Sequence, residues 1–213
     1  MGDEPEQIVL VRIEHAGRWY RLVFSNGFEI RATRKVIEMH ELKEGLALSP
    51  EAFEQLQKIL ERAYAFLCAE SLLAQHPYST RLFRERLRRK DIADELIADV
   101  TAAFKANGLL DDHQYALGCL RSLMLRKPAG KPFLVAYLQQ RGVPRPIAEK
   151  AVAEALAETD ETAIAVRLLE KRRTALANFD LETARRKAYT YLSRRSISYA
   201  AARKAFEQLF GKQ

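Results

Sequence analysis

The sequence of 213 residues has little of what metal sites, disulfide frameworks and nucleotide-binding enzymes require. It contains two cysteines and four histidines, and it has no Cys-x-x-Cys pair, no His-Glu-x-x-His motif and no glycine-rich phosphate loop. The histidines are scattered without the spacing of metal ligands. These absences disfavour an enzyme, and we expect no catalytic residue, no metal site and no cofactor.

Long apolar runs are also missing. No run approaches the roughly 20 residues that span a membrane, and no charged-then-apolar signal segment opens the chain. Cys68 and Cys119 fall on apolar helical faces, which favours structural thiols over a disulfide or a reactive nucleophile. We therefore expect a soluble, cytoplasmic monomer with no membrane partner.

Acidic residues are scarce in one part of the chain only. Residues 1–60 hold 8 Lys/Arg and 10 Asp/Glu, whereas residues 61–213 hold 27 and 18. The net charge of +7 therefore comes from the second part. Such an excess favours a polyanion or an acidic protein surface as the partner.

The first 48 residues predict a small β-rich domain. Residues 8–13 and 19–24 have the apolar, β-branched pattern of strands, and Asn26-Gly27 favours a type I′ hairpin turn into residues 28–31. Such a sheet is marginal alone and needs a helix on one face, which residues 36–42 supply. Ser49-Pro50 then starts a long helix that runs to about Gln75.

The stretch from Asn107 to Ala116 predicts a turn between two helices. Gly108 ends the preceding amphipathic helix, because glycine adopts the left-handed conformation without steric cost. Asp111 or Asp112 caps the next helix, and a metal or catalytic role for this pair is disfavoured. Leu109 and Leu110 are expected to anchor the turn between the helical layers.

The chain beyond the sheet repeats itself. A shift of 51 residues, followed by one of 54, superimposes apolar positions: Phe83 on Leu134, Leu87 on Leu138 and Leu192, Ile92 on Val143 and Ile197, Val100 on Ala151 and Ala205, and Phe104 on Ala155. Periods of this length are typical of stacked helical units. Ser79, Asp91, Asp160, Asp180 and Ser198 are expected to cap helices, whereas Gly130 is expected to open and Gly142 to close the middle helix of the second unit.

We therefore predict a mostly α protein, in which tandem three-helix repeats form an elongated curved array behind a small antiparallel β-sheet with a short helix. The expected domains are residues 1–48 (the sheet), 49–110 (a linking helix and the first repeat), 111–159 (the second repeat) and 160–213 (the third). The register of the helix at about residues 160–177 stays open.

Basic residues carry the main functional signal. Their runs are locally unbalanced by acids, which favours a polyanion-binding or acid-binding face over a merely solvated surface. Lys90, Arg141 and Arg195 also suit helix C-termini, and the runs 171–173 and 185–187 continue the pattern. The candidate binding residues are Arg81, Arg84, Arg88, Arg89, Lys90, Arg126, Lys127, Lys131, Arg141, Arg194 and Arg195.

Residues 108–116, Gly-Leu-Leu-Asp-Asp-His-Gln-Tyr-Ala, resemble the G-[YL]-[LI]-[ND]-D-x-x-[FY]-A signature of the RecX family of recombinase regulators. Residues 130–143 are similar to the family's G-x-x-x-[IL]-x-x-x-L-x-x-[KR]-G-[IV], and residues 79–90 match the corresponding stretch of the first unit. The third unit departs from this pattern, because Ser196 stands where the second unit has Gly142.

The resemblance implies a non-catalytic regulator that binds the RecA–DNA filament, lies in its helical groove and curbs strand exchange, ATP hydrolysis and co-protease action. An alternative is a direct single- or double-stranded DNA-binding module, and a third class is an enzyme acting on nucleic acid. The direction of regulation and the stoichiometry on the filament stay open.

Overall fold

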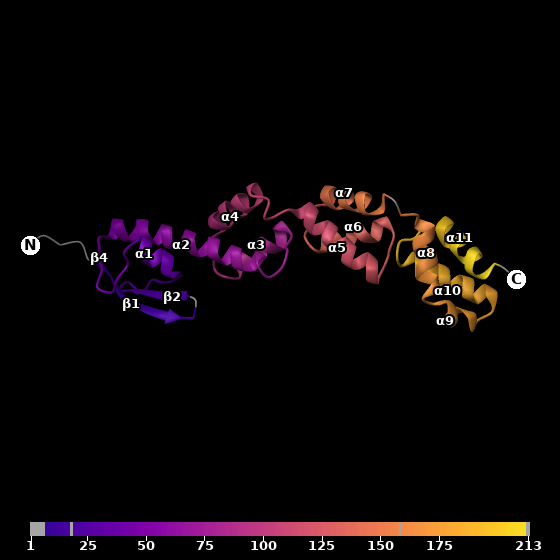
Figure 1. The fold of residues 1–213 in the computed structure, drawn as a ribbon, viewed down its shortest axis with the longest axis horizontal. Coiled ribbons are helices and arrows are strands. Elements are labelled where there is room, and N and C mark those ends of the chain that lie inside the picture. The colour runs from indigo at the N-terminus through magenta and orange to yellow at the C-terminus, as the bar shows by residue number, and fades with distance from the viewer. Residues whose placement is uncertain (1–6, 18, 158, 212–213) are drawn as a thin grey trace, which may run out of the picture. The chain divides into compact units, whose positions relative to one another are not determined.

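A computed structural model describes residues 7–17, 19–157 and 159–211 (Figure 1). Contacts divide the chain into two compact units. Unit 1 comprises Met1–Pro77 and Phe83–Leu109, and unit 2 comprises Tyr78–Leu82 and Leu110–Gln213. Within the described ranges, no helix is both long and apolar enough to cross a membrane.

The N-terminal sheet is antiparallel and has four strands in the order β3-β2-β1-β4. The strands are β1 (Ile8–Ala16), β2 (Trp19–Phe24), β3 (Glu29–Ala32) and β4 (Ala47–Leu48). A register shift between Leu10 and Arg12 interrupts the pairing of β1 with β2. The sequence did not predict β4, because two residues are too few to carry an alternating pattern.

The hairpin between β2 and β3 is confirmed, but its predicted type I′ turn is wrong. Gly27 has φ +84°, whereas Asn26 does not have positive φ. The Gly27 N–H donates to the Phe24 carbonyl at 3.0 Å, and the Asn26 side-chain oxygen accepts the Phe28 N–H at 3.0 Å. The loop therefore has three residues with glycine in the left-handed position, the other common hairpin solution.

Two helices follow the sheet in the expected places, α1 (Arg34–Met39) and α2 (Pro50–Leu73). Ser49 caps α2 by accepting the Ala52 N–H at 3.2 Å, and Pro50 occupies the first turn, as the sequence indicated. Phe53, Leu56 and Leu60 of α2 pack with the buried side chains of the sheet. One face of the sheet is thereby removed from water.

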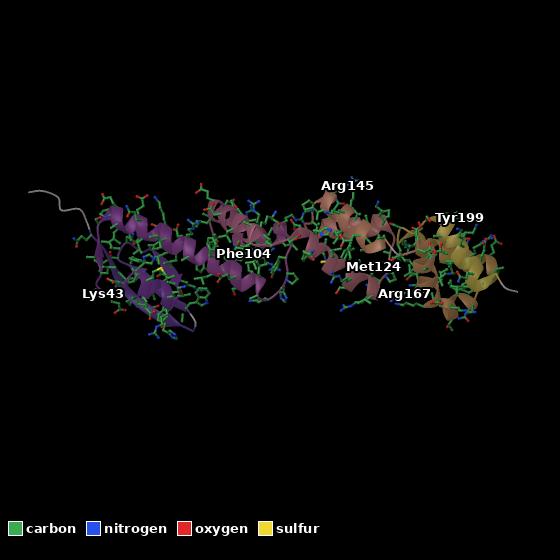
Figure 2. All side chains as sticks on the ribbon, turned by 45° about the horizontal axis from the view of Figure 1, so that its top comes forward. Lys43, Phe104, Met124, Arg145, Arg167 and Tyr199 are labelled. Carbon is green, nitrogen blue, oxygen red and sulfur yellow. The ribbon has the colours of Figure 1, made fainter. Side chains whose placement is uncertain are left out.

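The first repeat continues with α3 (Thr80–Arg88) and α4 (Asp94–Ala106). Phe104 (Figure 2) lies 6.0 Å, centroid to centroid, from the rings of both Phe66 and Phe83 in unit 1. Asp91 was expected to cap α4, which is wrong: Asp91 takes φ +56° after α3, and Ala93 precedes α4 without a side-chain cap.

The predicted turn after α4 is largely confirmed. Gly108 has φ +68°, and Asp111 caps α5 (Asp112–Arg126) by accepting the N–H groups of His113 and Gln114. Leu110 is buried, but Leu109 is 62% exposed, so only one of the two leucines anchors the turn.

The second and third repeats lie in unit 2. The second contains α5, α6 (Lys131–Gln140) and α7 (Arg145–Leu156); the third contains α8 (Glu161–Glu170), α9 (Arg173–Ala177), α10 (Leu181–Ser193) and α11 (Tyr199–Phe210). Side chains of Asp160, Asp180 and Ser198 cap α8, α10 and α11, as predicted. The segment 160–177, whose register was open, breaks into α8 and α9 at Lys171-Arg172.

The repeat alignment holds at the turns after the middle helices. Asp91, Gly142 and Ser196, which the alignment superimposes, all have positive φ. The aligned leucines Leu87, Leu138 and Leu192 are all fully buried, whereas Ala155 is exposed although its partner Phe104 is buried. The alignment therefore fails at Ala155, near the end of the third helix of the second repeat.

The cores of the second and third repeats meet in unit 2. Met124 (Figure 2) packs against both buried clusters. The Arg167 guanidinium donates to the Leu125 carbonyl at 3.3 Å. The proposed domain boundaries and the elongated curved arrangement stay predictions.

Candidate interaction surface

The start of α3 packs against the turn after α6, and we call this contact the first junction. The Ser79 hydroxyl donates to the Arg141 carbonyl at 2.6 Å, and the Arg81 guanidinium donates to the Gln140 carbonyl at 3.0 Å. A Cβ on Gly142 would lie 2.8 Å from Ser79 Oγ and from Arg81 Cβ. The turn can approach α3 this closely only because residue 142 is glycine.

A buried carboxylate completes the first junction. Asp112 is 6% exposed, and its two carboxylate oxygens accept the backbone N–H and the hydroxyl of Thr80, both at 2.7 Å. The two adjacent aspartates therefore have different roles. Asp111 caps α5, and Asp112 binds the start of α3 through Thr80. The structure gives no support for a metal role, and no cluster of three or more metal-ligating side chains occurs among the residues described.

The second junction has the same geometry one repeat further on. The start of α6 packs against the turn after α10, and the Gly130 N–H donates to the Arg195 carbonyl at 2.8 Å. A Cβ on Gly130 would overlap the carbonyl oxygen of Ser196. Here the glycine belongs to the helix start, whereas at the first junction it belongs to the turn.

The junctions bring several predicted binding residues together. Arg81 and Arg141 meet at the first junction. At the second, the Gly130–Arg195 hydrogen bond brings two exposed groups together: Arg126, Lys127 and Lys131 on one side, Arg194 on the other. These are places where cations from successive repeats gather.

Some of these cations are engaged in local contacts. The Arg141 guanidinium lies 3.7 Å from the centroid of the Tyr137 ring. Arg195 lies 5.9 Å from the Phe133 centroid and is half-buried. Such cation–π contacts hold a guanidinium in one orientation.

The remaining candidates belong to unit 1. Arg88 pairs with Asp94 at 2.7 Å, and the Nε of the half-buried Arg84 is buried without a hydrogen-bond partner. Arg89 and Lys90 are exposed and line a cleft of about 770 Å³ that also receives Arg31 and Tyr64. Arg84 and Arg88 are therefore less available for a partner than Arg89 and Lys90.

The sequence shows the basic runs 171–173 and 185–187 of the third repeat, but their residues were not among the candidates. Arg172, Arg186 and Lys187 line one hollow with Arg194. The signal in the sequence was the runs 171–173 and 185–187. The sequence could not show that Arg172, at the break between α8 and α9, lines the same hollow as Arg186 and Lys187 of α10.

Tyrosine–cysteine pairs recur at the same place in two repeats. Burial, followed by a hydrogen bond with Cys119, raises the pKa of Tyr115 to about 12. Burial and Cys68 likewise raise the pKa of Tyr64. Both cysteines are free thiols, of which Cys68 is buried and Cys119 is half-buried.

This geometry defines the class of the protein: it is a helical-repeat protein with basic residues at the junctions between repeats. The chain is 32% identical over 153 residues to the regulatory protein RecX of Prosthecochloris aestuarii, covering 72% of this chain and 94% of that protein. It is 30% identical over 145 residues to the regulatory protein RecX of Pelodictyon phaeoclathratiforme, covering 68% and 88%. No protein-family model matches.

The chain belongs to the RecX family of regulatory proteins. The fold agrees: a crystal structure of regulatory protein RecX aligns with a TM-score of 0.66 over 97% of this chain and 100% of that chain, at 16% identity. RecX from Lactobacillus salivarius aligns with a TM-score of 0.63 over 70% and 96%, at 20% identity. The mostly helical fold with its N-terminal sheet is thus the family's fold.

Proposed function

We propose that this protein binds the filament that RecA recombinase forms on DNA and restrains strand exchange, ATP hydrolysis and co-protease action. The observation that carries the proposal is membership of the RecX family, whose members are named as regulatory proteins. The protein acts by binding and not by catalysis.

The contact residues are the six candidate cations that are exposed and have no ion pair to a described carboxylate: Arg89, Lys90, Arg126, Lys127, Lys131 and Arg194. The other five, Arg81, Arg84, Arg88, Arg141 and Arg195, stabilise the fold, because each is half-buried or engaged with a neighbour. Exposed cations supply the charge that DNA phosphates or acidic RecA side chains would meet.

The decisive experiment separates RecA binding from DNA binding. RecA ATP hydrolysis is followed at a salt concentration that abolishes the protein's own DNA binding, since phosphate contacts weaken steeply with salt. Continued slowing of hydrolysis supports a direct RecA contact. If slowing disappears together with DNA binding, the alternative applies, a direct single- or double-stranded DNA-binding module.

A charge variant tests the contact residues. Replacing Arg126, Lys127 and Lys131 by Gln should weaken co-sedimentation with the filament and leave the melting temperature nearly unchanged, because solvated surface charges contribute little to stability. Replacing Lys43 (Figure 2), Lys150 and Lys204 by Gln removes the same charge from exposed positions elsewhere and is the control. Equal weakening by both variants would refute the assignment.

A further inference from the structure

The third repeat contains a hollow of about 510 Å³ beside α9 and α10 whose charged lining is entirely cationic. Its side chains come from both basic runs and from the turn between α9 and α10. They include Arg172, Arg186, Lys187 and Arg194 together with the rings of Phe179 and Tyr191. None of the described residues that line it is acidic.

These four cations are exposed, and no ion pair joins them to any carboxylate in the part of the chain that the structure describes. Elsewhere, exposed arginines pair along their own helices, as Arg34 does with Glu38 at 2.7 Å and Arg145 with Glu149 at 2.8 Å. The nearby Asp180 is committed to capping α10 through the Thr183 N–H at 2.9 Å. The hollow therefore holds positive charge that the protein itself does not neutralise.

Aromatic rings order two of the cations. The Arg172 guanidinium lies 4.1 Å from the Tyr191 centroid, and the Lys187 ammonium lies 4.3 Å from the Phe179 centroid. Cations resting on rings are held in place without losing their charge. Phe179 nevertheless remains 45% exposed, which leaves part of this ring open to a ligand.

The combination favours a nucleotide over an acidic peptide. Guanidinium groups bind phosphate and carboxylate alike, so the charge alone does not distinguish the two. An exposed ring does, because nucleobases stack on aromatic side chains and carboxylates do not. The volume is within the range of about 300–1,000 Å³ typical of small-molecule sites, which is room for about one nucleotide.

We propose that this hollow is a nucleotide subsite that selects single-stranded nucleic acid. A phosphate lies among Arg172, Arg186 and Arg194, and the base stacks on Phe179. Duplexes are disfavoured, because their bases are already stacked on one another and present no free face. This binding requires no RecA and stands or falls independently of the filament proposal.

The ring is tested by fluorescence anisotropy of the full chain with a 12-residue oligo-dT. Phe179→Ala should weaken binding about fivefold to a hundredfold, the usual loss for one stacked base, without changing the salt slope. Phe179→Tyr keeps the ring and should retain binding. An unchanged affinity in Phe179→Ala would overturn the proposal.

The phosphate contacts are tested by replacing Arg172, Arg186 and Arg194 with Gln. The log–log salt slope on oligo-dT should become shallower by about 0.7, since one single-strand phosphate contact contributes about that much. The Lys43, Lys150 and Lys204 variant, with equal charge loss, should change the slope less. Should the triple variant unfold, Arg186→Gln alone, whose side chain rests on no ring here, should also make the slope shallower, by up to about 0.7.

Two competing probes complete the test. Duplex DNA of the same length and a poly-glutamate peptide should both bind more weakly than oligo-dT. Binding of poly-glutamate as tight as that of oligo-dT would identify the hollow as an acidic-protein surface and overturn the proposal. Equal binding of duplex and single strand would overturn its selectivity for single strands.

Discussion

The two junctions of unit 2 reach one geometry by opposite choices of residue. At the first, the helix start offers Ser79 and the turn offers Gly142; at the second, the helix start offers Gly130 and the turn offers Ser196. In each pair one partner lacks a Cβ: a Cβ on Gly142 would meet side-chain atoms of Ser79 and Arg81, and a Cβ on Gly130 would meet the backbone carbonyl of Ser196. The pairing, and not glycine at a fixed position, is what the repeat requires.

The junctions differ in what holds them. Side chains do so at the first, where the Ser79 hydroxyl, the Arg81 guanidinium and the Asp112 carboxylate all bond across the contact. At the second, the backbone hydrogen bond from Gly130 to Arg195 has this role. Hydrogen bonds to charged groups are worth more than neutral ones, so we expect the first junction to be the more costly one to break.

The largest effect is expected from Gly142→Ser, which gives the second repeat the residue that the third repeat has at the aligned position, Ser196. A serine there has positive φ and its Cβ would meet Ser79 and Arg81, so backbone strain and overpacking together should cost about 2–4 kcal/mol. Urea unfolding measures this loss.

Two further variants separate the causes. Gly108→Ala has the same positive φ with open space around its Cβ, and should lose only about 1–2 kcal/mol. Adding Ser79→Gly to Gly142→Ser recreates the second junction's pairing and should recover part of the loss. An equal loss for Gly108 and Gly142, with no recovery, would mean that the junction imposes no packing constraint.

The next effect concerns the two adjacent aspartates. Asp112→Ala removes charged hydrogen bonds to Thr80 from a buried site and should cost about 1.5–3 kcal/mol. Asp111→Ala removes an exposed helix cap and should cost about 0.5–2 kcal/mol. Chemical denaturation of both variants checks the order, and a larger loss for Asp111 would contradict the role of Asp112 at the junction.

The fold was predictable wherever the signal is local. Gly108 and Asp111 act within their own turn, and the burial of Leu138 follows from the repeat period. The same reasoning failed for Asp112, because its partner Thr80 lies 32 residues away. The predicted cap at Asp91 was also wrong, because Asp91 adopts the left-handed conformation in the turn after α3 and does not precede α4.

The candidate surface was predictable as a set of basic residues but not as a site. Sequence spacing put Arg84 and Arg88 on one helical face, yet one is half-buried and the other is paired with Asp94. Conversely, Arg172 and Arg186 are distant in sequence and meet in one hollow. Which cations remain unneutralised depends on tertiary contacts, which neither charge counts nor periodicity contain.

A smaller effect, of opposite sign, is expected at the second junction. Ser196 has φ +55°, which a non-glycine residue adopts only under strain. Ser196→Gly should relieve this strain, partly offset by the greater freedom of glycine in the unfolded chain, and stabilise the protein by up to about 1 kcal/mol. Thermal unfolding measures the gain. A loss instead would mean that the serine side chain contributes more than its backbone strain costs.

The smallest effect is a pH dependence of stability that arises from Tyr115, which lies near Arg141 of the first junction. The pKa of Tyr115 is raised to about 12 chiefly by burial, and the Arg141 cation acts in the opposite direction. The ordinary tyrosine pKa is about 10, so from about pH 10 to 12 the folded chain keeps a proton that the unfolded chain has lost. Stability from this group is therefore complete below pH 10 and falls as pH rises through that window.

Tyr115→Phe removes the titrating group and keeps the ring, so its unfolding midpoint in urea should fall less between pH 9 and pH 11 than that of the unchanged protein. Some dependence should remain, because the pKa values of Tyr64 and Tyr189 are also raised by burial. Tyr189→Phe, in the third repeat, is the matched control. Burial is the main cause of the raised pKa of Tyr189 as well, but this pKa is raised less than that of Tyr115. If both variants reduce the pH dependence of the unfolding midpoint equally, titration of Tyr115 does not distinguish the first junction. The difference between the junctions then depends on their hydrogen bonds alone.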